Sequence, residues 1–388
     1  MILHTYYQSP GGEDLVVATE TSLLQRKGHQ VASLTFHNRR LDSMAVWRQT
    51  TVTLWNAQAY HEVRKLAFEV KPDIIHIHNT FPLASPAAVH AARAAQVPVV
   101  MTLHNYRLLC PVSLFFRDGR VWEACLGKAV PWPGVLHGCW RGRLPSAVVA
   151  AMLSLHRCLR TWDKVSIYIA LTEFARRKFI AGGLPADKIV VKPNVVDPDP
   201  GVGMNAGGYA LFVGRLSPEK GVDTLLAAWQ RLQGKIPLKI VGDGPLAEKV
   251  RQAAQQLAGV EWLGYQNISS VYALMKNASF LVFPSKVYEG FPRVIVEAFA
   301  CGLPILSTCL GSQGSLIDHG RTGLLFRPKD PDDLTAKVEW LLAHPVELTR
   351  MQQAARREYE ERYAVEVNYQ QLVAIYEQAI SLERSGSG

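Results

Sequence analysis

The sequence lacks the segments that mark secreted and membrane-spanning proteins. No charged segment followed by an apolar one opens the chain, so we expect no secretory signal. The longest wholly apolar run in its basic region, residues 147–153, is far too short to cross a bilayer. The six cysteines include no Cys-x-x-Cys pair, which favours reduced thiols over a disulfide framework. These absences predict a cytoplasmic protein, at most peripheral on the inner face of the cytoplasmic membrane.

The chain also lacks zinc-finger, RRM and KH signatures, which disfavours a nucleic-acid-binding protein. Its formal net charge of +9 then suits an anionic membrane surface or a phosphorylated small molecule. Hydrophobic residues make up 48% of the 388 residues and charged residues 19%, as in a globular protein with a hydrophobic core. This length is sufficient for two domains of ordinary size.

The first half of the chain alternates strands and helices. The predicted strands are residues 1–7, 30–36, 73–78, 97–103, 165–171 and 188–192, and the predicted helices are 15–27, 56–69, 141–160 and 173–181. This βαβ pattern predicts a parallel sheet, in which ligands bind beyond the carboxyl ends of the strands. The Gly11-Gly12 turn and His104 lie at such ends, and both are site candidates. A lone Gly-Gly turn or strand-end histidine can equally be structural.

An irregular segment rich in Cys, Trp, Arg and Gly interrupts this alternation at about residues 106–145. Its three cysteines are Cys110, Cys125 and Cys139. A zinc site normally has four ligands in recognisable pairs, so we expect free thiols and no metal, although His104 or His137 could complete a set. The helix at 141–160 is apolar with arginines at both ends. Such a helix suits either an anionic membrane surface or partial burial with exposed arginine heads.

A segment dense in Pro, Gly and Asp, residues 193–208, marks a domain boundary. Asp197 and Asp199 in it match a metal-binding Asp-x-Asp, but a Pro-rich hinge explains them better. The second half repeats the alternation, with strands at 209–213, 238–241, 260–263, 280–283, 304–307 and 324–326. One helix is predicted after Gly221 and ends at residue 232, and three more are predicted at 332–343, 346–362 and 365–382. The last residues, 383–388, have the composition of a flexible tail.

One stretch of the second half pairs two carboxylates with a helix N-terminus. Glu289 lies in a loop, Pro292 suits the first helical turn, and Glu297 follows inside an apolar helix. Free backbone N–H groups at such an N-terminus favour a phosphate. An unpaired charge at Glu297 would be costly, so we expect a ligand hydroxyl or a buried partner beside it. Taken alone, the pair could also be a solvated glutamate face.

Several further polar residues and glycines are expected at the same sheet edge. They are Gly214, Arg215, Lys220, Gly242, Asp243, Gly244 and Gly264. Arg215 and Lys220 supply two cations to a glycine-containing loop, which suits a diphosphate. Glu297 can accept both hydroxyls of a ribose, and Glu289 can accept hydroxyls of a sugar. The set therefore suits a nucleoside diphosphate-sugar.

These residues carry a family resemblance over essentially the whole chain. The matching motifs are Gly11-Gly-Glu13, His104, Asn194-Val-Val-Asp197, Val213-Gly-Arg-Leu216 with Lys220, Val241-Gly-Asp-Gly-Pro245, and the E-x(7)-E pair Glu289 and Glu297. The chain resembles retaining glycosyltransferases of family 4, and its segment from His104 to Pro111 resembles bacterial members that build surface polysaccharides. The resemblance implies an α/β protein of the GT-B fold, with two Rossmann-like parallel-sheet domains facing across a cleft and a C-terminal helix crossing back to the first domain. The implied parts are an acceptor-binding domain (1–196), a hinge (197–208), a nucleotide-sugar domain (209–364), the helix (365–382) and the tail (383–388).

The resemblance also implies roles for individual residues. Arg215 and Lys220 would hold the diphosphate and stabilise the leaving group, and His104 would face the donor sugar. Glu289 would bind the transferred sugar, with a covalent nucleophile as its lesser option, and Glu297 would bind the ribose. The remaining implied binding residues are Gly11, Gly12, Gly214, Gly242, Gly264, Tyr265, Gly290, Phe291, Pro292, Arg293 and Val294. No divalent cation is implied, and Trp122 stands where such relatives often have a fourth cysteine, which argues against an inherited zinc site.

The predicted function is therefore retaining, metal-independent transfer of a hexose from a UDP- or GDP-linked donor to a hydroxyl of a saccharide or a polyprenyl-diphosphate-linked saccharide. The basic surface and the helix at 141–160 favour the lipid-linked acceptor and a role in surface polysaccharide synthesis. A GT-B epimerase or phosphorylase would use the same fold, but nothing marks the pyridoxal lysine of a phosphorylase. A non-catalytic sugar-nucleotide-binding protein is the second alternative, and the intact set of charged residues argues against it.

Overall fold

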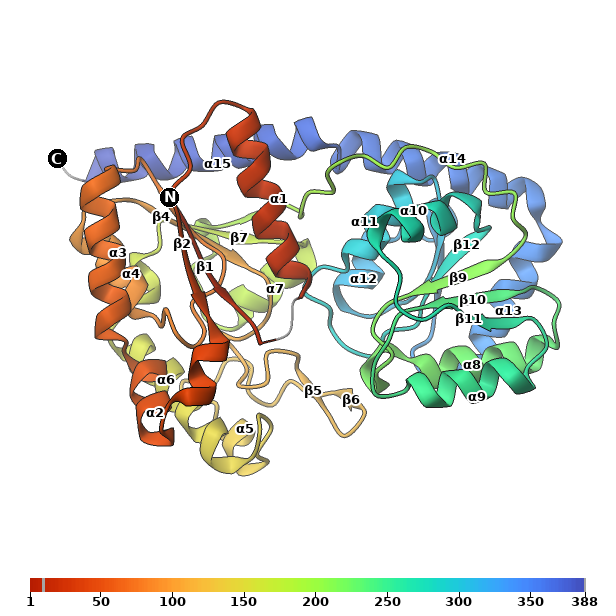
Figure 1. Ribbon diagram of the computed structural model, residues 1–388, viewed down its shortest axis with the longest axis horizontal. Coiled ribbons are helices and arrows are strands. Elements are labelled where there is room, and N and C mark those ends of the chain that lie inside the picture. Colours follow the sequence, from red (N-terminus) through yellow and green to blue (C-terminus); the bar gives the residue numbers. More distant parts are fainter. Residues whose placement is uncertain (9–10, 387–388) are drawn as a thin grey trace. The chain divides into compact units, whose positions relative to one another are not determined.

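The computed structural model describes residues 1–8 and 11–386, which form two compact units. The N-terminal unit comprises Met1–Phe115, Trp122–Val195 and Asn368–Gly388, and the C-terminal unit comprises Phe116–Val121 and Val196–Val367. Each unit contains one parallel sheet of six strands covered by helices (Figure 1). The predicted α/β architecture with two parallel-sheet domains is confirmed.

The sheet of the N-terminal unit has the strand order β2-β1-β3-β4-β7-β8. Its strands are β1 (Ile2–Tyr6), β2 (Ser33–His37), β3 (Ile75–Ile77), β4 (Val99–Leu103), β7 (Ile167–Ala170) and β8 (Ile189–Val191). Its helices are α1 (Gly12–Arg26), α2 (Val46–Leu54), α3 (Ala57–Val70), α4 (Ala87–Ala94), α5 (Trp132–Leu136), α6 (Arg143–Cys158) and α7 (Glu173–Ala181), with 3₁₀ turns η1 (Asn38–Ser43), η2 (Trp162–Lys164) and η3 (Ala186–Lys188). All strand pairs of this sheet are parallel, so their carboxyl ends lie at one edge.

The C-terminal helix α15 (Val365–Gly386) packs on the first sheet. Its Leu372, Ile375 and Ala379 are buried in one cluster with Ile2 and Val100, which confirms that this helix joins the first domain. The prediction that a flexible tail begins at residue 383 was wrong as far as residue 386. Glu383 accepts hydrogen bonds from the Arg93 guanidinium and the Ser166 hydroxyl, and these bonds hold the last turns of the helix.

The sheet of the C-terminal unit has the strand order β11-β10-β9-β12-β13-β14. Its strands are β9 (Ala210–Val213), β10 (Leu238–Val241), β11 (Val260–Trp262), β12 (Phe280–Phe283), β13 (Ile305–Thr308) and β14 (Gly323–Phe326). Its helices are α8 (Val222–Leu232), α9 (Ala247–Gln256), α10 (Ile268–Asn277), α11 (Arg293–Ala300), α12 (Gly311–Leu316), α13 (Pro331–Ala343) and α14 (Pro345–Arg362), with the 3₁₀ turn η4 (Pro218–Lys220). The chain crosses from one side of β9 to the other between β11 and β12, which is where ligands bind in open parallel sheets.

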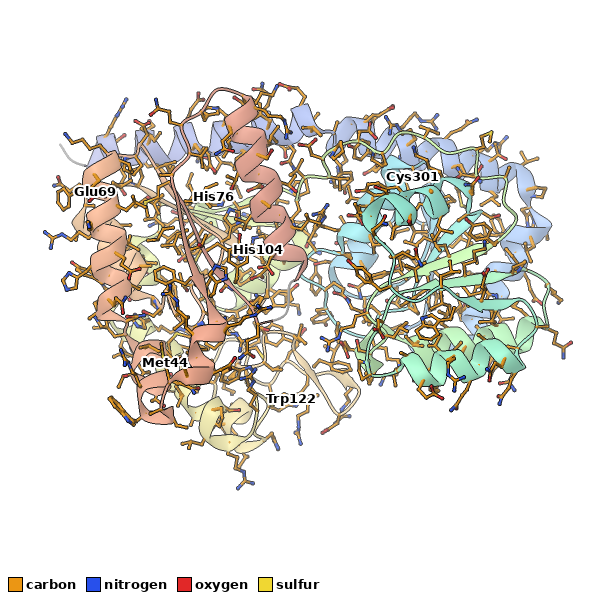
Figure 2. All side chains as sticks on the ribbon, viewed as in Figure 1. Met44, Glu69, His76, His104, Trp122 and Cys301 are labelled. Atoms are coloured by element: carbon orange, nitrogen blue, oxygen red, sulfur yellow. The ribbon has the colours of Figure 1, made fainter. Side chains whose placement is uncertain are left out.

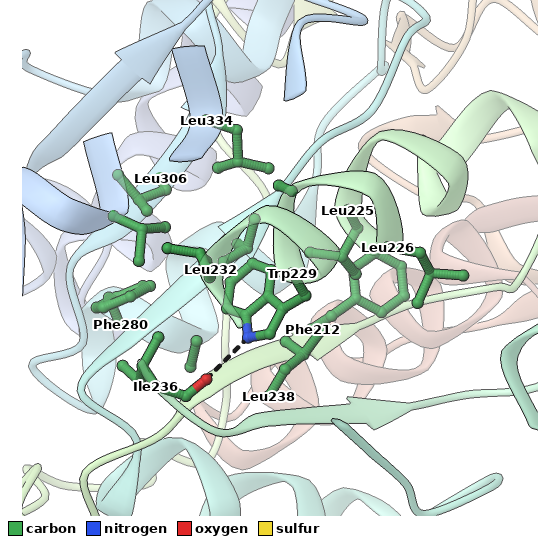
Figure 3. Close-up of a cluster of buried hydrophobic side chains, with 14 of the residues drawn as sticks. Phe212, Leu225, Leu226, Trp229, Leu232, Ile236, Leu238, Phe280, Leu306 and Leu334 are labelled. Atoms are coloured by element: carbon green, nitrogen blue, oxygen red, sulfur yellow. Dashed lines mark hydrogen bonds between the residues drawn. The ribbon is translucent and has the colours of Figure 1, made fainter. Parts of the chain in front are cut away.

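A tryptophan lies at the centre of one of this unit's apolar layers (Figure 3). The side chain of Trp229 on α8 is 1% exposed and packs among Phe212, Leu238 and Phe280. Its indole N–H donates to the carbonyl of Ile236 at 3.0 Å, so its one polar atom is satisfied. Truncating a buried aromatic side chain of this kind costs about 3–5 kcal/mol of stability. This layer fixes the strands whose carboxyl ends carry the candidate site.

The linker at residues 193–208 has no regular element, as predicted, and its part from residue 199 onward is attached to the C-terminal unit. The backbone N–H groups of Gly203, Asn205 and Gly207 donate to carbonyls of the C-terminal unit at 2.7–3.0 Å. Asp199 receives two hydrogen bonds of 2.9 Å from the Arg356 guanidinium. A carboxylate paired in this way is a structural anchor, which agrees with the hinge interpretation of the Asp-x-Asp sequence.

The irregular segment contains the short helix α5 and a two-stranded hairpin, β5 (Phe116–Arg117) and β6 (Arg120–Val121), which belongs to the C-terminal unit. Cys110 and Cys125 are buried, and a hydrogen bond between the two thiols lowers the pKa of Cys110 to about 7. Cys139 is half-buried. Trp122 contacts the His137 ring edge to face at 5.3 Å.

Candidate active site

Three glycine-containing loops interlock at the carboxyl edge of the second sheet. The Gly214 N–H donates to the carbonyl of Val241 at 3.1 Å, and the Gly242 N–H donates to the carbonyl of Gly264 at 2.8 Å. Gly242 has a φ of +135°, and a Cβ there would lie 1.9 Å from the carbonyl oxygen of Gly214. Only glycine allows this approach of two backbones. The prediction that these loops gather at one edge is confirmed.

Lys220 and Glu289 form an ion pair beside these loops. Lys220 ends η4, just after β9, and Glu289 lies in the loop after the neighbouring strand β12. The Lys220 Nζ lies 2.8 Å from Glu289 Oε1, and the Ser285 hydroxyl donates to the same oxygen at 2.6 Å. The Lys220 side chain is 27% exposed and that of Glu289 14%, so both can still reach a ligand. The structure thus brings two predicted catalytic residues into direct contact.

Arg215 follows β9 on the same loop and is exposed. Among residues 1–8 and 11–386, its side chain has no hydrogen bond or ion pair, so its guanidinium can bind an anion. Tyr265 follows Gly264, and its side chain is 80% exposed. An exposed tyrosine beside a glycine turn offers a face on which a planar base can stack.

Helix α11 begins at Arg293, and Pro292 is its N-cap. The prediction that Pro292 occupies the first helical turn was therefore wrong by one position. Its extended backbone conformation, with ψ of 90°, places it just before the helix. The first N–H groups of a helix have no partners one turn earlier and carry the positive end of its dipole, and in α11 the Ile295 N–H donates to the carbonyl of the N-cap Pro292 at 2.9 Å. Phe291 and Val294 pack against the core, so this turn presents backbone atoms to a ligand at Gly290 and beyond.

The buried partner expected for Glu297 is Arg293, one turn earlier on the same helix. Arg293 Nη2 lies 3.1 Å from Glu297 Oε1, and both side chains are about 10% exposed or less. Burial raises the pKa of Glu297, and the Arg293 guanidinium opposes that rise. The Nε and Nη1 atoms of Arg293 are buried and lack hydrogen-bond partners in the described part of the chain. Such donors are costly to leave unpaired, which makes them suited to an oxygen-rich ligand.

The carboxyl edge of the first sheet carries a different set of groups. Gly11 caps α1, its N–H donates to the Asp14 carboxylate at 2.8 Å, and both Gly11 and Gly12 are exposed. His104 (Figure 2) follows β4 and is half-buried. Its ring shares a hydrogen bond of 3.0 Å with the ring of His78. Burial lowers the pKa of His104 to about 3, so its ring is neutral.

Glu13 lies between these two features and was not predicted as a functional side chain. Its Oε1 accepts from the Asn79 amide at 2.9 Å, and its Oε2 accepts from the Asn105 amide at 3.4 Å. Burial, followed by repulsion from Asp14, raises its pKa to about 8. Ser285 was also missed, although its position after a buried strand and four residues before Glu289 is visible in the sequence.

Two groups of side chains in the described residues have the spacing of metal ligands. The first is Glu20, His76 and His78, and the second is His4, Glu13 and Asp14. In the first group the ammonium of Lys192, 2.7 Å from Glu20, already supplies the positive charge. In the second group, the His4 ring and the Asp14 carboxylate hydrogen bond directly at 2.7 Å. Neither arrangement leaves a set of free ligand atoms, so we assign no metal to them.

Comparisons with known families match nearly the whole chain. The family described as Glycosyltransferase Family 4 matches residues 10–200, and the family described as Glycosyl transferases group 1 matches residues 206–358. The meeting point of the two matches falls in the linker between the two units.

Individual relatives match parts of the chain. An uncharacterized glycosyltransferase of Methanocaldococcus jannaschii is 38% identical over 138 residues, 34% of this chain and 38% of that protein. A GDP-mannose-dependent alpha-mannosyltransferase of Corynebacterium glutamicum is 30% identical over 277 residues, 71% of this chain and 60% of that protein. The matches to the first curated relatives span less than half the length of those proteins.

The fold is also that of solved structures. Alr3699/HepE of Anabaena, solved in complex with UDP, superposes with a TM-score of 0.69 at 20% identity and covers 96% of this chain and 99% of its own. Together with the two parallel sheets, this likeness identifies the GT-B fold.

Proposed function

Because the chain belongs to glycosyltransferase family 4, we propose that it transfers a sugar from a nucleoside diphosphate-sugar to a hydroxyl acceptor with retention of anomeric configuration. The observation that carries this proposal is the edge of the second sheet. There Arg215 and Lys220 offer two cations, three glycine-containing loops interlock around Gly242, and α11 begins at Arg293, four residues after Glu289. Two cations and a helix N-terminus suit a diphosphate.

Leaving-group stabilisation follows from charge. As the bond between the sugar C1 and the β-phosphate oxygen breaks, negative charge grows on the phosphate. Lys220 then exchanges its contact with Glu289 for the phosphate, which frees the Glu289 carboxylate to accept hydrogen bonds from sugar hydroxyls. The acceptor oxygen forms the new bond to C1 on the face that the phosphate leaves, and its proton passes to a phosphate oxygen. One donor of this kind is worth about 3–4 kcal/mol in the transition state.

Glu289 is a poor candidate for a covalent nucleophile in this arrangement. Its Oε1 accepts from both Lys220 and Ser285, at 2.8 and 2.6 Å. When Lys220 turns to the phosphate, the Ser285 hydroxyl remains as a donor to Glu289 and still lowers the nucleophilicity of the carboxylate. This hydrogen bond supports direct front-face transfer over a two-step route through a glycosyl-enzyme.

We assign the ribose to Glu297 and the transferred sugar to Glu289 and the backbone from Gly290, with His104 contacting the sugar. A diol donates two hydrogen bonds to a carboxylate, which offsets the cost of burying Glu297. The unpartnered Nε and Nη1 of Arg293 are suited to oxygens of the same ligand. Tyr265 and Gly264 are assigned to the base.

The identity of the base can be measured directly. The Anabaena neighbour was solved with UDP and with UDP-glucose, and the Corynebacterium relative is named for GDP-mannose. A thermal-shift screen with UDP, GDP, ADP and their sugars identifies the tightest ligand, because binding to the native state raises its stability. Proton NMR of the product then shows whether the anomeric configuration is retained.

Analysis of the products formed from the nucleotide-sugar separates this proposal from its alternatives. A transferase releases free nucleoside diphosphate only as sugar is transferred or hydrolysed, whereas an epimerase yields a second sugar nucleotide and a binding protein yields nothing. We further propose that no divalent cation is needed, because Arg215, Lys220 and the α11 N-terminus supply the positive charge. Turnover unchanged by EDTA supports this, and turnover restored only by added Mg²⁺ or Mn²⁺ contradicts it.

We propose that the acceptor binds a groove of about 640 Å³ in the N-terminal unit. At its inner end lie Tyr7 and Arg107, whose guanidinium stacks 4.3 Å from the ring of Phe81. At its mouth, Val46 on α2 and Leu144 on α6 are 69% and 70% exposed. A groove that is polar and cationic inside and apolar at its mouth suits a saccharide joined through a diphosphate to a polyprenyl lipid.

The surface around the mouth supports peripheral binding to an anionic membrane face. Trp47 is 71% exposed next to Val46, and Arg141 lies on the groove wall with its guanidinium 5.4 Å from the Trp140 ring. Exposed apolar side chains with flanking arginines favour the interface of an anionic bilayer. No helix within the described ranges is long and apolar enough to cross a membrane.

Vesicle flotation at low salt tests this surface. We expect the protein to float with vesicles containing anionic lipid and to remain behind with zwitterionic ones. The variant Trp47→Ser/Leu144→Ser should lose flotation while keeping donor hydrolysis, since both side chains are exposed. Equal flotation of this variant and the native protein would contradict the proposal.

A further inference from the structure

A row of four polar side chains runs through the N-terminal unit and ends at His104. The Lys192 ammonium lies 2.7 Å from Glu20 Oε1, and Glu20 Oε2 lies 3.6 Å from His78 Nε2. His78 Nδ1 then shares a hydrogen bond of 3.0 Å with His104 Nε2. Lys192, Glu20 and His78 are each less than 5% exposed, whereas His104 is half-buried. The row therefore connects a buried ion pair to a ring that can reach a ligand.

Two neighbouring strands and the helix packed on them align these groups. His76 and His78 are two residues apart on β3 and its extension, so they point to one face of the sheet. Thr102 and His104 do the same on the neighbouring strand β4. Helix α1 covers this face, with Val17 and Leu24 in the same apolar cluster as Ile2, and brings Glu20 down onto His78.

The charges of the row are fixed by its surroundings. Burial acts to raise the pKa of Glu20, but the charge and the hydrogen bond of Lys192, together with the contributions of His78 and His104, lower it overall. Burial lowers the pKa of His78 well below its usual range and that of His104 to about 3. The carboxylate is thus ionised and both rings are neutral at physiological pH. Each ring carries one N–H, and its position decides what His104 offers to a ligand.

Electrostatics selects one tautomer for each ring. At 3.6 Å, a ring N–H at His78 Nε2 is attracted to the Glu20 carboxylate, whereas a nitrogen lone pair is repelled. His78 Nδ1 is then the hydrogen-bond acceptor, so the donor in the 3.0 Å contact is His104 Nε2. This leaves His104 Nδ1 without a proton, as an acceptor.

We propose that Glu20, held by Lys192, acts through His78 to fix the tautomer of His104, so that His104 Nδ1 accepts a hydrogen bond from a hydroxyl of the donor sugar. The last clause rests on the proposed function, and the tautomer does not. Glu20, Lys192 and His78 are positioning residues, because they act through His104 and do not touch the sugar. A ring in the other tautomer would present an N–H to the same hydroxyl and would require it to turn and accept.

The other charged and polar neighbours of the row do not compete for His104 Nε2. His76 is saturated by the hydroxyls of Tyr376 and Thr102, each at 2.7 Å. His4 is bound to Asp14 at 2.7 Å. The Glu20 carboxylate therefore decides which ring donates in the hydrogen bond between His78 and His104.

Nitrogen-15 NMR of the full-length protein labelled at histidine reads the tautomer directly. In the native protein we expect a His104 signal with a protonated Nε2 and a bare Nδ1, assigned by its loss in His104→Asn. In Glu20→Leu/Lys192→Met, which replaces the ion pair with apolar side chains of similar size, we expect His104 to populate both tautomers. Such replacements of buried pairs are often neutral or stabilising, so this variant should fold.

A bare Nε2 in native His104, or an unchanged single tautomer in the double variant, overturns the proposal. The matched control is Glu123→Gln/Lys178→Met, which removes another ion pair of the same unit, 2.6 Å long, that does not reach His104. The control should leave the His104 signal unchanged. Lys192→Arg keeps the positive charge, so His104 should keep its single tautomer in this variant. If this variant does not fold, the tautomer of His104 in the native spectrum tests the proposal.

Donor kinetics connect the tautomer to function. We expect kcat with the nucleotide-sugar to fall about tenfold or more in Glu20→Leu/Lys192→Met and to be native in the control pair variant, since removing partners that orient a catalytic histidine usually has at least this effect. A tautomer that follows Glu20 while His104→Asn leaves turnover unchanged supports the positioning row and contradicts the assignment of His104 to the sugar. The two failures are therefore distinguishable.

Discussion

The two units carry the same kind of sheet edge but handle charge in opposite ways. In the N-terminal unit, Lys192 and Glu20 are 2–3% exposed and are paired with each other. In the C-terminal unit, Lys220 is 27% exposed and Arg215 lies on the surface without a partner in the described residues. The first edge thus fixes neutral imidazoles in place, while the second keeps cations available for an anion.

This difference suggests a division of labour. A buried ion pair contributes little net stability, but breaking it leaves an uncompensated charge, so it is a rigid element. A half-exposed pair such as Lys220 and Glu289 is weak and can exchange partners when a phosphate arrives. We expect substitutions at the first edge to act mainly on stability and orientation, and those at the second to act mainly on donor turnover.

The largest expected effect is on folding stability at the first edge. Lys192→Ala leaves Glu20 buried and unpaired, so the free energy of unfolding should fall by about 3–5 kcal/mol. Lys220→Ala should lower it by no more than about 1 kcal/mol, because that pair is partly solvated. Urea unfolding of both variants measures this difference. Similar losses in the free energy of unfolding for the two variants would contradict the contrast between the two sheet edges.

The next effect is on turnover at the second edge. Lys220→Ala should lower kcat by about 10²–10³, the usual cost of losing one donor to a developing oxyanion. Lys235→Ala is the matched control, since Lys235 forms an exposed ion pair with Glu339 in the same unit. Native turnover in Lys220→Ala, measured by release of the nucleoside diphosphate, would refute the role assigned to Lys220.

A smaller effect is expected from the interlocked glycine loops. Gly242→Ala places a Cβ 1.9 Å from the Gly214 carbonyl oxygen at a φ of +135°, so the loop must shift. Strain of this kind costs about 1–3 kcal/mol, and affinity for UDP or GDP should fall with it. Gly214→Ala meets nothing closer than 3.6 Å and should leave the melting temperature near native. Equal melting temperatures for both variants would show that the close approach is not needed.

The last expected effect is a dependence of stability on pH at the first edge. The folded-state pKa of Glu13 is about 8 against an ordinary value of 4.5, so the folded protein keeps a proton that the unfolded chain releases. Its contribution to stability is complete below about pH 4.5 and is lost as the pH rises through 8. Glu13→Gln should remove this part of the slope, so that the variant gains on the native protein between pH 6 and 8.5 in urea unfolding. Parallel pH profiles would contradict the raised pKa.

The sequence predicted the elements with clear periodicity and missed those without it. Both sheets and the long amphipathic helices follow from apolar spacing and turn residues. Helix α4 was missed because five of its eight residues are alanine and only His90 and Arg93 mark its polar face, which is too short a pattern to reveal a period. The helix α15 was predicted, but its last turns depend on a contact of Glu383 with Arg93, 290 residues away in sequence.

The site was predictable where it depends on local motifs. Lys220, Glu289 and the glycine loops were found because strand ends meet at one edge. The partner of Glu297 was visible too, since Arg293 lies four residues earlier on the same helix face. The contacts of Glu20 with Lys192 and of His78 with His104 join residues 172 and 26 positions apart, and no spacing rule predicts such pairs.

The most direct test of the account is calorimetric titration of UDP and GDP into the native protein, Lys220→Ala and the control Lys235→Ala. We predict that at least one nucleotide binds the native protein and the control equally and binds Lys220→Ala at least about tenfold more weakly, a loss of about 1.4 kcal/mol. Equal affinity of Lys220→Ala and the native protein would contradict the claim that the edge of the second sheet binds the donor diphosphate.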